Sequence, residues 1–308
     1  MQTLEPAHLI DGVHWWELAG HHEPAALDDT WRRLHHAVQA VAEAGKSWAD
    51  ERDDDSHSAL VWVPDHSKLP DQFFAGELVH GELSDAGARV LLRPWDLRLF
   101  VIDAAGAPLA ELNAEERTIG DLIAWVRGTL TERVGEPTQD ARPAPDLPSH
   151  PVENGAPFGE PNQLAMAEVI RFYANADAML QKIATLIDAT DEPKVWPHHF
   201  DIATLATIDT DSDGGMTKTI GIGLTPPDDT SDAGYWYVSP WSKDGGSSEG
   251  GWPVLPHGAW KPRDDALPLA ILRVADVTST EERKEQHERV ATFIASAYTA
   301  LRAAFDTA

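Results

Sequence analysis

The segment 196–201 (WPHHFD) carries the densest group of chemically active side chains in the sequence. Pro197 restricts the backbone, and we predict that a strand begins near Phe200. Side chains alternate along a strand, so His199 and Asp201 would share one face. A histidine and a carboxylate placed in this way can be two ligands of a metal ion, or a base and the group that orients it.

A metal or acid–base site of this kind needs at least one more polar partner. The alternative is that the imidazoles and the carboxylate cap the preceding loop by hydrogen bonding, and both interpretations stay open. A divalent metal ion is the one cofactor that His199 and Asp201 suggest, and no other cofactor is indicated. The histidines that could complete the site are His14, His21, His22, His35, His36, His80 and His257.

Aromatic side chains are the second candidate feature, because the chain has twelve tryptophans. In 235–237 (YWY) the strand period places Trp236 on one face and both tyrosines, Tyr235 and Tyr237, on the other. Aromatic surfaces with acidic residues nearby suit sugars or cationic ligands through stacking and cation–π contacts. The alternative is that these rings fill the core. The other tryptophans expected where strands meet loops are Trp196, Trp241, Trp252 and Trp260.

Two loops were also considered as sites. The acidic stretch 209–214 has the D-x-D-x-D-G spacing of a calcium-binding loop, but Ile220 occupies the position of the required glutamate, so we predict a hairpin turn. The glycine-rich stretch 245–251 lacks the Lys-Ser/Thr ending of a phosphate loop, and we predict a loop that could cover a site. No nucleophile elbow, zinc-protease motif or dinucleotide fingerprint is present, so the sequence names no reaction, and whether the chain is an enzyme stays open.

The composition excludes several classes of function. The 308 residues include 24 basic and 51 acidic ones, and the formal charge of -27 repels nucleic acids and anionic membranes. Without cysteine there is no disulfide, thiolate nucleophile or cysteine-ligated metal. No long apolar run predicts a membrane span, and 1–12 lacks the pattern of a secretory signal. We therefore expect a cytoplasmic protein, and the sequence does not predict its oligomeric state.

The elements that would position these residues form two similar halves. We predict an α+β fold with an N-terminal half at 1–134, a proline-rich connection at 135–162 and a C-terminal half at 163–308. Each half reads as helix, antiparallel meander, helix, which is either an internal duplication or a chance recurrence of a common arrangement. The predicted helices are 28–45, 118–130, 164–187 and 279–308, and the predicted strands are 58–63, 74–82, 89–92, 97–102, 200–208, 217–224, 235–239 and 269–274.

Three segments carry a resemblance to a known family. They are a T-x-x-x-L-H helix segment at 30–35, the segment 196–201, and the tyrosine-rich strand and proline at 235–241. Together they resemble an uncharacterised bacterial family of unknown function that has a W-P-x-H-F-D segment before a late strand. The family has no assigned activity. The resemblance implies that the three segments converge and that His35, His199 and Asp201 share a surface.

Two functions follow from these observations. The first is binding of a small molecule or a metal ion in a pocket between the halves. The second is a non-catalytic interaction or regulatory module with an acidic surface. The residues predicted to form the pocket are His35, Trp196, His198, His199, Asp201, Tyr235 and Tyr237.

Overall fold

The chain folds into two compact units, each made of separate stretches of sequence. The computed structural model describes residues 4–11, 15–22, 24–63, 76–80, 87–140, 147–247 and 251–307. Unit 1 comprises Met1–Gly20, Asn175–Pro193 and Ile202–Ala308, and unit 2 comprises His21–Ala174 and Lys194–Asp201. These boundaries differ from those of the predicted halves, because the N-terminal twenty residues group with the C-terminal strands and 194–201 groups with the N-terminal strands.

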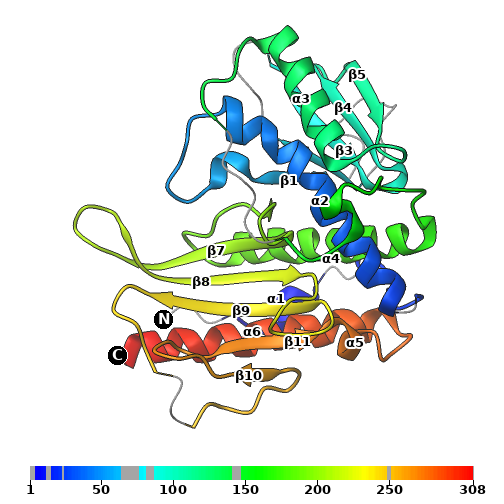
Figure 1. Ribbon diagram of the computed structural model, residues 1–308. Helices are drawn as coiled ribbons and strands as arrows, with labels where there is room; N and C mark the ends of the chain where they lie inside the picture. Colours follow the sequence, from blue (N-terminus) through cyan, green and yellow to red (C-terminus); the bar gives the residue numbers. More distant parts are fainter. Residues whose placement is uncertain are drawn as a thin grey trace. The chain divides into compact units, whose positions relative to one another are not determined.

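Unit 2 is an antiparallel sheet covered on one face by helices (Figure 1). Its strand order is β6-β1-β2-β3-β4-β5. The long helix α2 (Pro24–Trp48) packs on β2 and β3, and α3 (Ile119–Val134) packs on α2 and β4. The strands are β1 (Leu60–Val63), β2 (Glu77–His80), β3 (Arg89–Arg93), β4 (Arg98–Ile102), β5 (Pro108–Asn113) and β6 (Lys194–Trp196).

Local sequence explains the helices of unit 2. The predicted apolar stripe of α2, which includes Leu34 and Val38, is buried against the sheet. The predicted cap of α3 is confirmed as a capping box, because the Asp121 amide donates to the Thr118 hydroxyl over 3.2 Å and the Thr118 amide donates to the Asp121 carboxylate over 2.9 Å. The helix α4 (Gln163–Leu186) begins in unit 2 and continues into unit 1.

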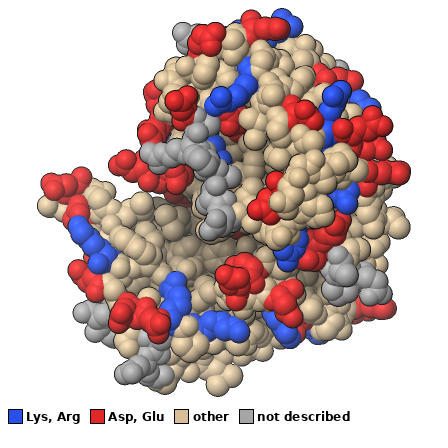
Figure 2. Space-filling view, viewed as in Figure 1, with Lys and Arg blue, Asp and Glu red and all other residues tan. Residues whose placement is uncertain are grey.

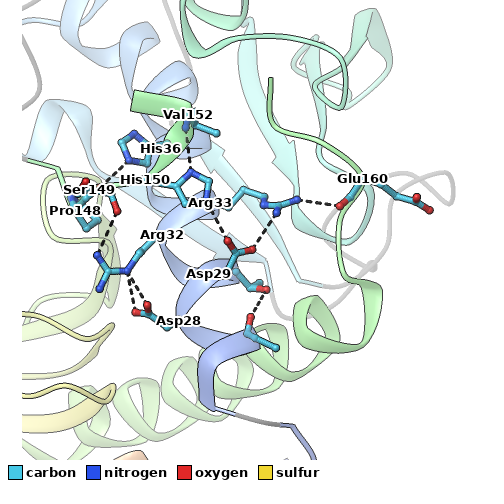
Figure 3. Close-up of polar contacts among 12 residues, drawn as sticks. Asp28, Asp29, Arg32, Arg33, His36, Pro148, Ser149, His150, Val152 and Glu160 are labelled. Carbon is cyan, nitrogen blue, oxygen red and sulfur yellow. Dashed lines mark hydrogen bonds and ion pairs between the residues drawn. The ribbon is translucent and has the colours of Figure 1, made fainter. Parts of the chain in front are cut away.

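The end of the proline-rich stretch is anchored on α2 (Figure 3). Arg32 donates to the Ser149 carbonyl, Arg33 donates to the Glu160 carbonyl over 2.9 Å, and the His36 Nε2 lies 2.9 Å from the Pro148 carbonyl. Two apolar side chains of the same stretch, Val152 and Phe158, are buried. This part of the predicted connection is therefore a packed element of unit 2.

The strands of unit 1 are also antiparallel, in the order β10-β11-β9-β8-β7. The C-terminal helix α6 (Arg283–Thr307) packs on β8, β9 and β11, and α1 (Pro6–Ile10) packs on α6. In Figure 1 the strands lie in front of α6, so the face that they turn to the viewer is the one opposite α6. The remaining elements are β7 (Asp201–Thr210), β8 (Met216–Thr225), β9 (Tyr235–Ser242), β10 (Ala259–Lys261), β11 (Leu269–Arg273) and α5 (Val274–Val277).

The acidic stretch 209–214 closes the hairpin between β7 and β8, as predicted. The Asp211 carboxylate accepts the amides of Asp213 and Gly215 over 3.2 Å and 2.8 Å, and Gly214 adopts a left-handed conformation with φ of 84°. The Asp211 carboxylate therefore stabilises the turn through these hydrogen bonds.

The fold class is therefore mixed α+β, with antiparallel sheets and covering helices. Three short strands, β5, β6 and β10, were not predicted. Within the described ranges, no helix is both long enough and apolar enough to cross a membrane. Figure 2 shows acidic side chains spread over the visible face without one dominant acidic patch.

Candidate functional site

The segment 196–201 forms a turn followed by a strand. Residues 197–200 are turn residues, and Phe200 adopts a left-handed conformation with φ of 52°. Its amide donates to the Trp196 carbonyl over 2.7 Å, and β7 begins only at Asp201. The alternation predicted from Phe200 onward is therefore wrong at its start, because a left-handed residue separates His199 from the strand.

Side chains from two helices hold this turn. The Pro197 carbonyl accepts from the Nε2 atoms of His35 and Gln39, at 3.1 Å and 2.6 Å, both from α2. The Phe200 carbonyl accepts from the Tyr173 hydroxyl of α4. The Phe200 ring lies against the rings of His35 and Tyr173, with centroid distances of 5.8 Å and 5.0 Å. His35 thus contacts the segment, as a donor that stabilises the turn.

Burial lowers the pKa values of two histidines of this region, His35 and His198. The pKa of His35 is lowered to about 4, with burial as the main cause and the neighbouring His36 imidazole as the second. Burial also lowers the pKa of His198 to about 4, with the adjacent His199 imidazole as a second cause. Burial raises the pKa of the Tyr173 hydroxyl well above its usual value, so this hydroxyl stays a donor. At neutral pH the imidazoles of His35 and His198 are therefore neutral.

The other predicted residues of the segment differ in exposure. Asp201 is buried and His199 is exposed. Trp196 is half-buried at the end of β6, where its ring contacts His198 at a centroid distance of 5.9 Å. Among the residues that the structure describes, no group of three His, Asp or Glu side chains could hold a metal ion. His14 and the side chain of His80 lie outside the described residues.

Tyr235 and Tyr237 belong to unit 1, on one face of β9, with ring centroids 6.5 Å apart. The Tyr235 hydroxyl donates to the Asp228 carboxylate over 2.7 Å. Trp236 points to the opposite face and stacks on Trp16, with centroids 6.2 Å apart. The predicted alternation of this strand is confirmed. Tyr237 is half-buried.

Unit 1 contains a pocket at the end of β9 that was not predicted from the sequence. Its volume is about 250 Å³. The indole of Trp241 is 52% exposed, an unusually open position for so large an apolar side chain, and it forms part of the wall. Gly245, from the predicted glycine-rich loop, also lines it. The full lining is Pro240, Trp241, Ser242, Gly245, Arg263, Asp265, Ala266, Leu267 and Phe305.

Hydrogen bonds fix the polar wall of this pocket. Arg263 donates from Nε and Nη2 to the Leu267 carbonyl over 2.9 Å and 2.8 Å, and from Nη2 to the Pro240 carbonyl over 2.7 Å. Its Nη1 donates to the Ser239 hydroxyl over 3.3 Å. Burial lowers the pKa of the guanidinium, which remains charged at neutral pH. Arg263 therefore braces the loop against β9.

The sequence contained only part of the signal for this pocket. Trp241 was one of the aromatic candidates, and Gly245 lies in the glycine-rich stretch. The other lining residues come from the 263–267 loop and from α6, and no spacing connects them to β9.

No protein-family model, curated protein or solved structure matches this chain. The resemblance based on 30–35, 196–201 and 235–241 stays a prediction.

Proposed function

We propose that the chain binds a small organic molecule, and that the ligand occupies the pocket at Trp241. The observation that carries this proposal is a half-exposed indole in the wall of a pocket of about 250 Å³. Ligand sites are concave and combine apolar or aromatic walls with a few polar groups. Here the apolar walls include Trp241 and Phe305, and the polar groups include Ser242 and Asp265.

The size and chemistry of the pocket restrict the ligand. Drug-sized ligands occupy pockets of roughly 300–1,000 Å³, so a pocket below this range suits a single ring or one end of a longer molecule. The indole offers a flat surface for stacking. Arg263 is already bonded to carbonyls and a hydroxyl, so its charge serves mainly to hold the wall.

The segment 196–201 supports this function less well. The pKa values of His35 and His198 are lowered to about 4, and the carbonyls of Pro197 and Phe200 are used by helix side chains. Metal binding by His199 and Asp201 remains a separate prediction. Native mass spectrometry with metal analysis, on the wild type and on His199→Ala, tests it.

Tryptophan indole resonances provide the test of the proposed function. A fragment library is added to ¹⁵N-labelled protein, and the indole signals are assigned with Trp241→Phe and Trp196→Phe. We expect ring-containing fragments to shift the Trp241 signal and to leave the Trp196 signal in place. A library in which no fragment moves the Trp241 signal would contradict the proposal.

A non-catalytic interaction module is the second candidate, and a specific loop favours it. Val254 is 94% exposed between two prolines, while the Trp252 and Trp260 rings pack together at a centroid distance of 4.9 Å. An ordered loop that presents an apolar side chain is typical of contact surfaces. Val254→Asp should then weaken any self-association seen by analytical ultracentrifugation, and a wild type that is monomeric at all concentrations argues against association between copies.

Three further expectations belong to the same proposal. The proposal that the two halves are an internal duplication rests on the order of elements that they share. The expectation that the chain binds no nucleic acid rests on its formal charge of -27. The cytoplasmic location is tested by cell fractionation.

A further inference from the structure

We infer that the ligand is a linear neutral saccharide, whose end enters the Trp241 pocket and whose next units lie along β9. This inference rests on the proposed function, because it extends the same site. It starts from three side chains, Tyr237, Ser239 and Trp241, which occupy alternate positions of β9 and therefore point to the same face.

The spacing of this row suits an elongated ligand. A strand rises about 3.4 Å per residue, so neighbouring members of the row are roughly 7 Å apart and the whole row spans about 14 Å. A single ring in the pocket would reach only Trp241. A ligand that also contacts Tyr237 must extend along the strand, as a short oligosaccharide does.

Glycines on the neighbouring strand keep the surface beside this row low. Gly221 and Gly223 of β8 pair with Ser239 and Tyr237. A Cβ on Gly223 would lie 2.6 Å from the Ile202 carbonyl oxygen and 2.8 Å from the Tyr237 hydroxyl. Only glycine therefore allows the Tyr237 ring to lie beside β8 in this way. The Tyr237 ring itself fills the space above Gly223, which fixes the position of this ring in the row.

Hydroxyl groups continue the same face next to Trp241. Thr219 of β8 pairs with Trp241, and Thr207 of β7 pairs with Thr219. Thr219 is buried, whereas the half-buried hydroxyls of Thr207 and Ser239 offer donors and acceptors beside the aromatic rings. A sugar ring matches this combination, because one of its faces is apolar and its edges carry hydroxyls.

Charge is absent from the centre of this face in the described strands. The residues in register on β7 and β8 are Ala203, Leu205, Thr207, Thr219, Gly221 and Gly223, none of which is charged. At the margins, Arg263 is bonded to carbonyls and Arg273 forms an ion pair with Asp276 at 3.0 Å. Figure 2 shows mostly uncharged surface over the middle of β8. An anionic ligand would lose its hydration here and would meet the Asp265 carboxylate in the pocket, so the site favours a neutral ligand over an anionic one.

Calorimetric titration with defined hexasaccharides tests the inference. The neutral probes are cellohexaose, maltohexaose, xylohexaose and laminarihexaose, and the charged probe is hexagalacturonate. We expect at least one neutral probe to bind and hexagalacturonate not to bind. Tyr237→Ala and Trp241→Ala should each weaken the binding at least tenfold.

The matched control is Trp95→Ala, which removes a 42% exposed tryptophan from unit 2 and should leave the affinity unchanged. Circular dichroism confirms that each variant is folded, and Tyr237→Phe, which keeps the ring, serves where the alanine variant does not fold. If fragments shift the Trp241 indole signal but no neutral hexasaccharide binds, the inference is wrong while the proposed function stands. Preferential binding of hexagalacturonate also overturns it. If no molecule of any kind affects Trp241, both fail.

Discussion

The turn at 196–201 and the pocket at Trp241 differ in whether their polar groups are already engaged. The turn has two histidines, an aspartate and a tryptophan, yet its carbonyls accept from His35, Gln39 and Tyr173, and the Phe200 ring is buried. The pocket contains no recognisable motif, but it has open volume and a half-exposed indole. Reactive residue types therefore indicate a site only where the fold leaves them accessible.

The largest effect on stability is expected for Phe200→Ala. The Phe200 ring is 1% exposed, and removing a buried phenylalanine lowers the free energy of unfolding by about 3–5 kcal/mol. Alanine keeps the strained left-handed backbone, so the change reports on packing. Urea denaturation followed by circular dichroism measures it. The exposed neighbour is the control, since His199→Ala should change stability by less than about 0.5 kcal/mol. Equal effects of both changes would show that the turn is not the packed element described above.

The buried histidine of the turn predicts a loss of stability in acid. The pKa of His35 is lowered to about 4 in the folded chain against 6.5 when unfolded, so its contribution is intact above pH 6.5. As the pH falls from 6.5 to 4 the unfolded chain takes up the proton first, and up to about 3 kcal/mol is lost. His35→Gln keeps a donor for Pro197 but does not titrate. Its unfolding free energy should therefore fall less steeply than that of the wild type over this range, and parallel curves would refute the assignment.

Two Tyr→Phe substitutions, one near the turn and one in unit 1, each remove a single hydroxyl group and so compare the two regions. Tyr173→Phe removes the donor to the Phe200 carbonyl in a fully buried setting and should lower the unfolding free energy by about 1–3 kcal/mol. Tyr235→Phe in unit 1 removes a part-buried bond to Asp228, whose carboxylate remains hydrated, and should lower it by about 0.5–1 kcal/mol. Thermal and urea unfolding of both variants give the order, and a reversed order would contradict the difference in burial.

Trp241→Ala is expected to have the smallest effect on stability and the largest effect on binding. Trp241 is half-exposed, so Trp241→Ala should change the free energy of unfolding by less than about 1 kcal/mol. The same change should weaken ligand binding at least tenfold. A strongly destabilised variant would show that the indole is mainly a packing residue.

Periodic features were predictable from sequence, and long-range ones were not. The apolar stripe of α2, the Thr118 cap and the alternation of Tyr235 with Trp236 are local patterns, and the structure confirms them. The strands β6 and β10 have three residues each, too few for a period to be recognised. The left-handed Phe200 is held by Tyr173, 27 positions away, so no local signal could reveal it.

The pocket was missed for a related reason. Its walls come from β9, from the 263–267 loop and from Phe305 of α6, and only folding brings these segments together. Sequence reasoning selected Trp241 and Gly245 separately, without a way to place them in one site.

Calorimetric titration of the best-bound ligand into three proteins tests the central claim most directly. The proteins are the wild type, Trp241→Ala and His199→Ala. We expect Kd to rise at least tenfold for Trp241→Ala and to stay within about twofold for His199→Ala, which is less than about 0.4 kcal/mol. A ligand whose Kd depends on His199 and not on Trp241 would contradict it.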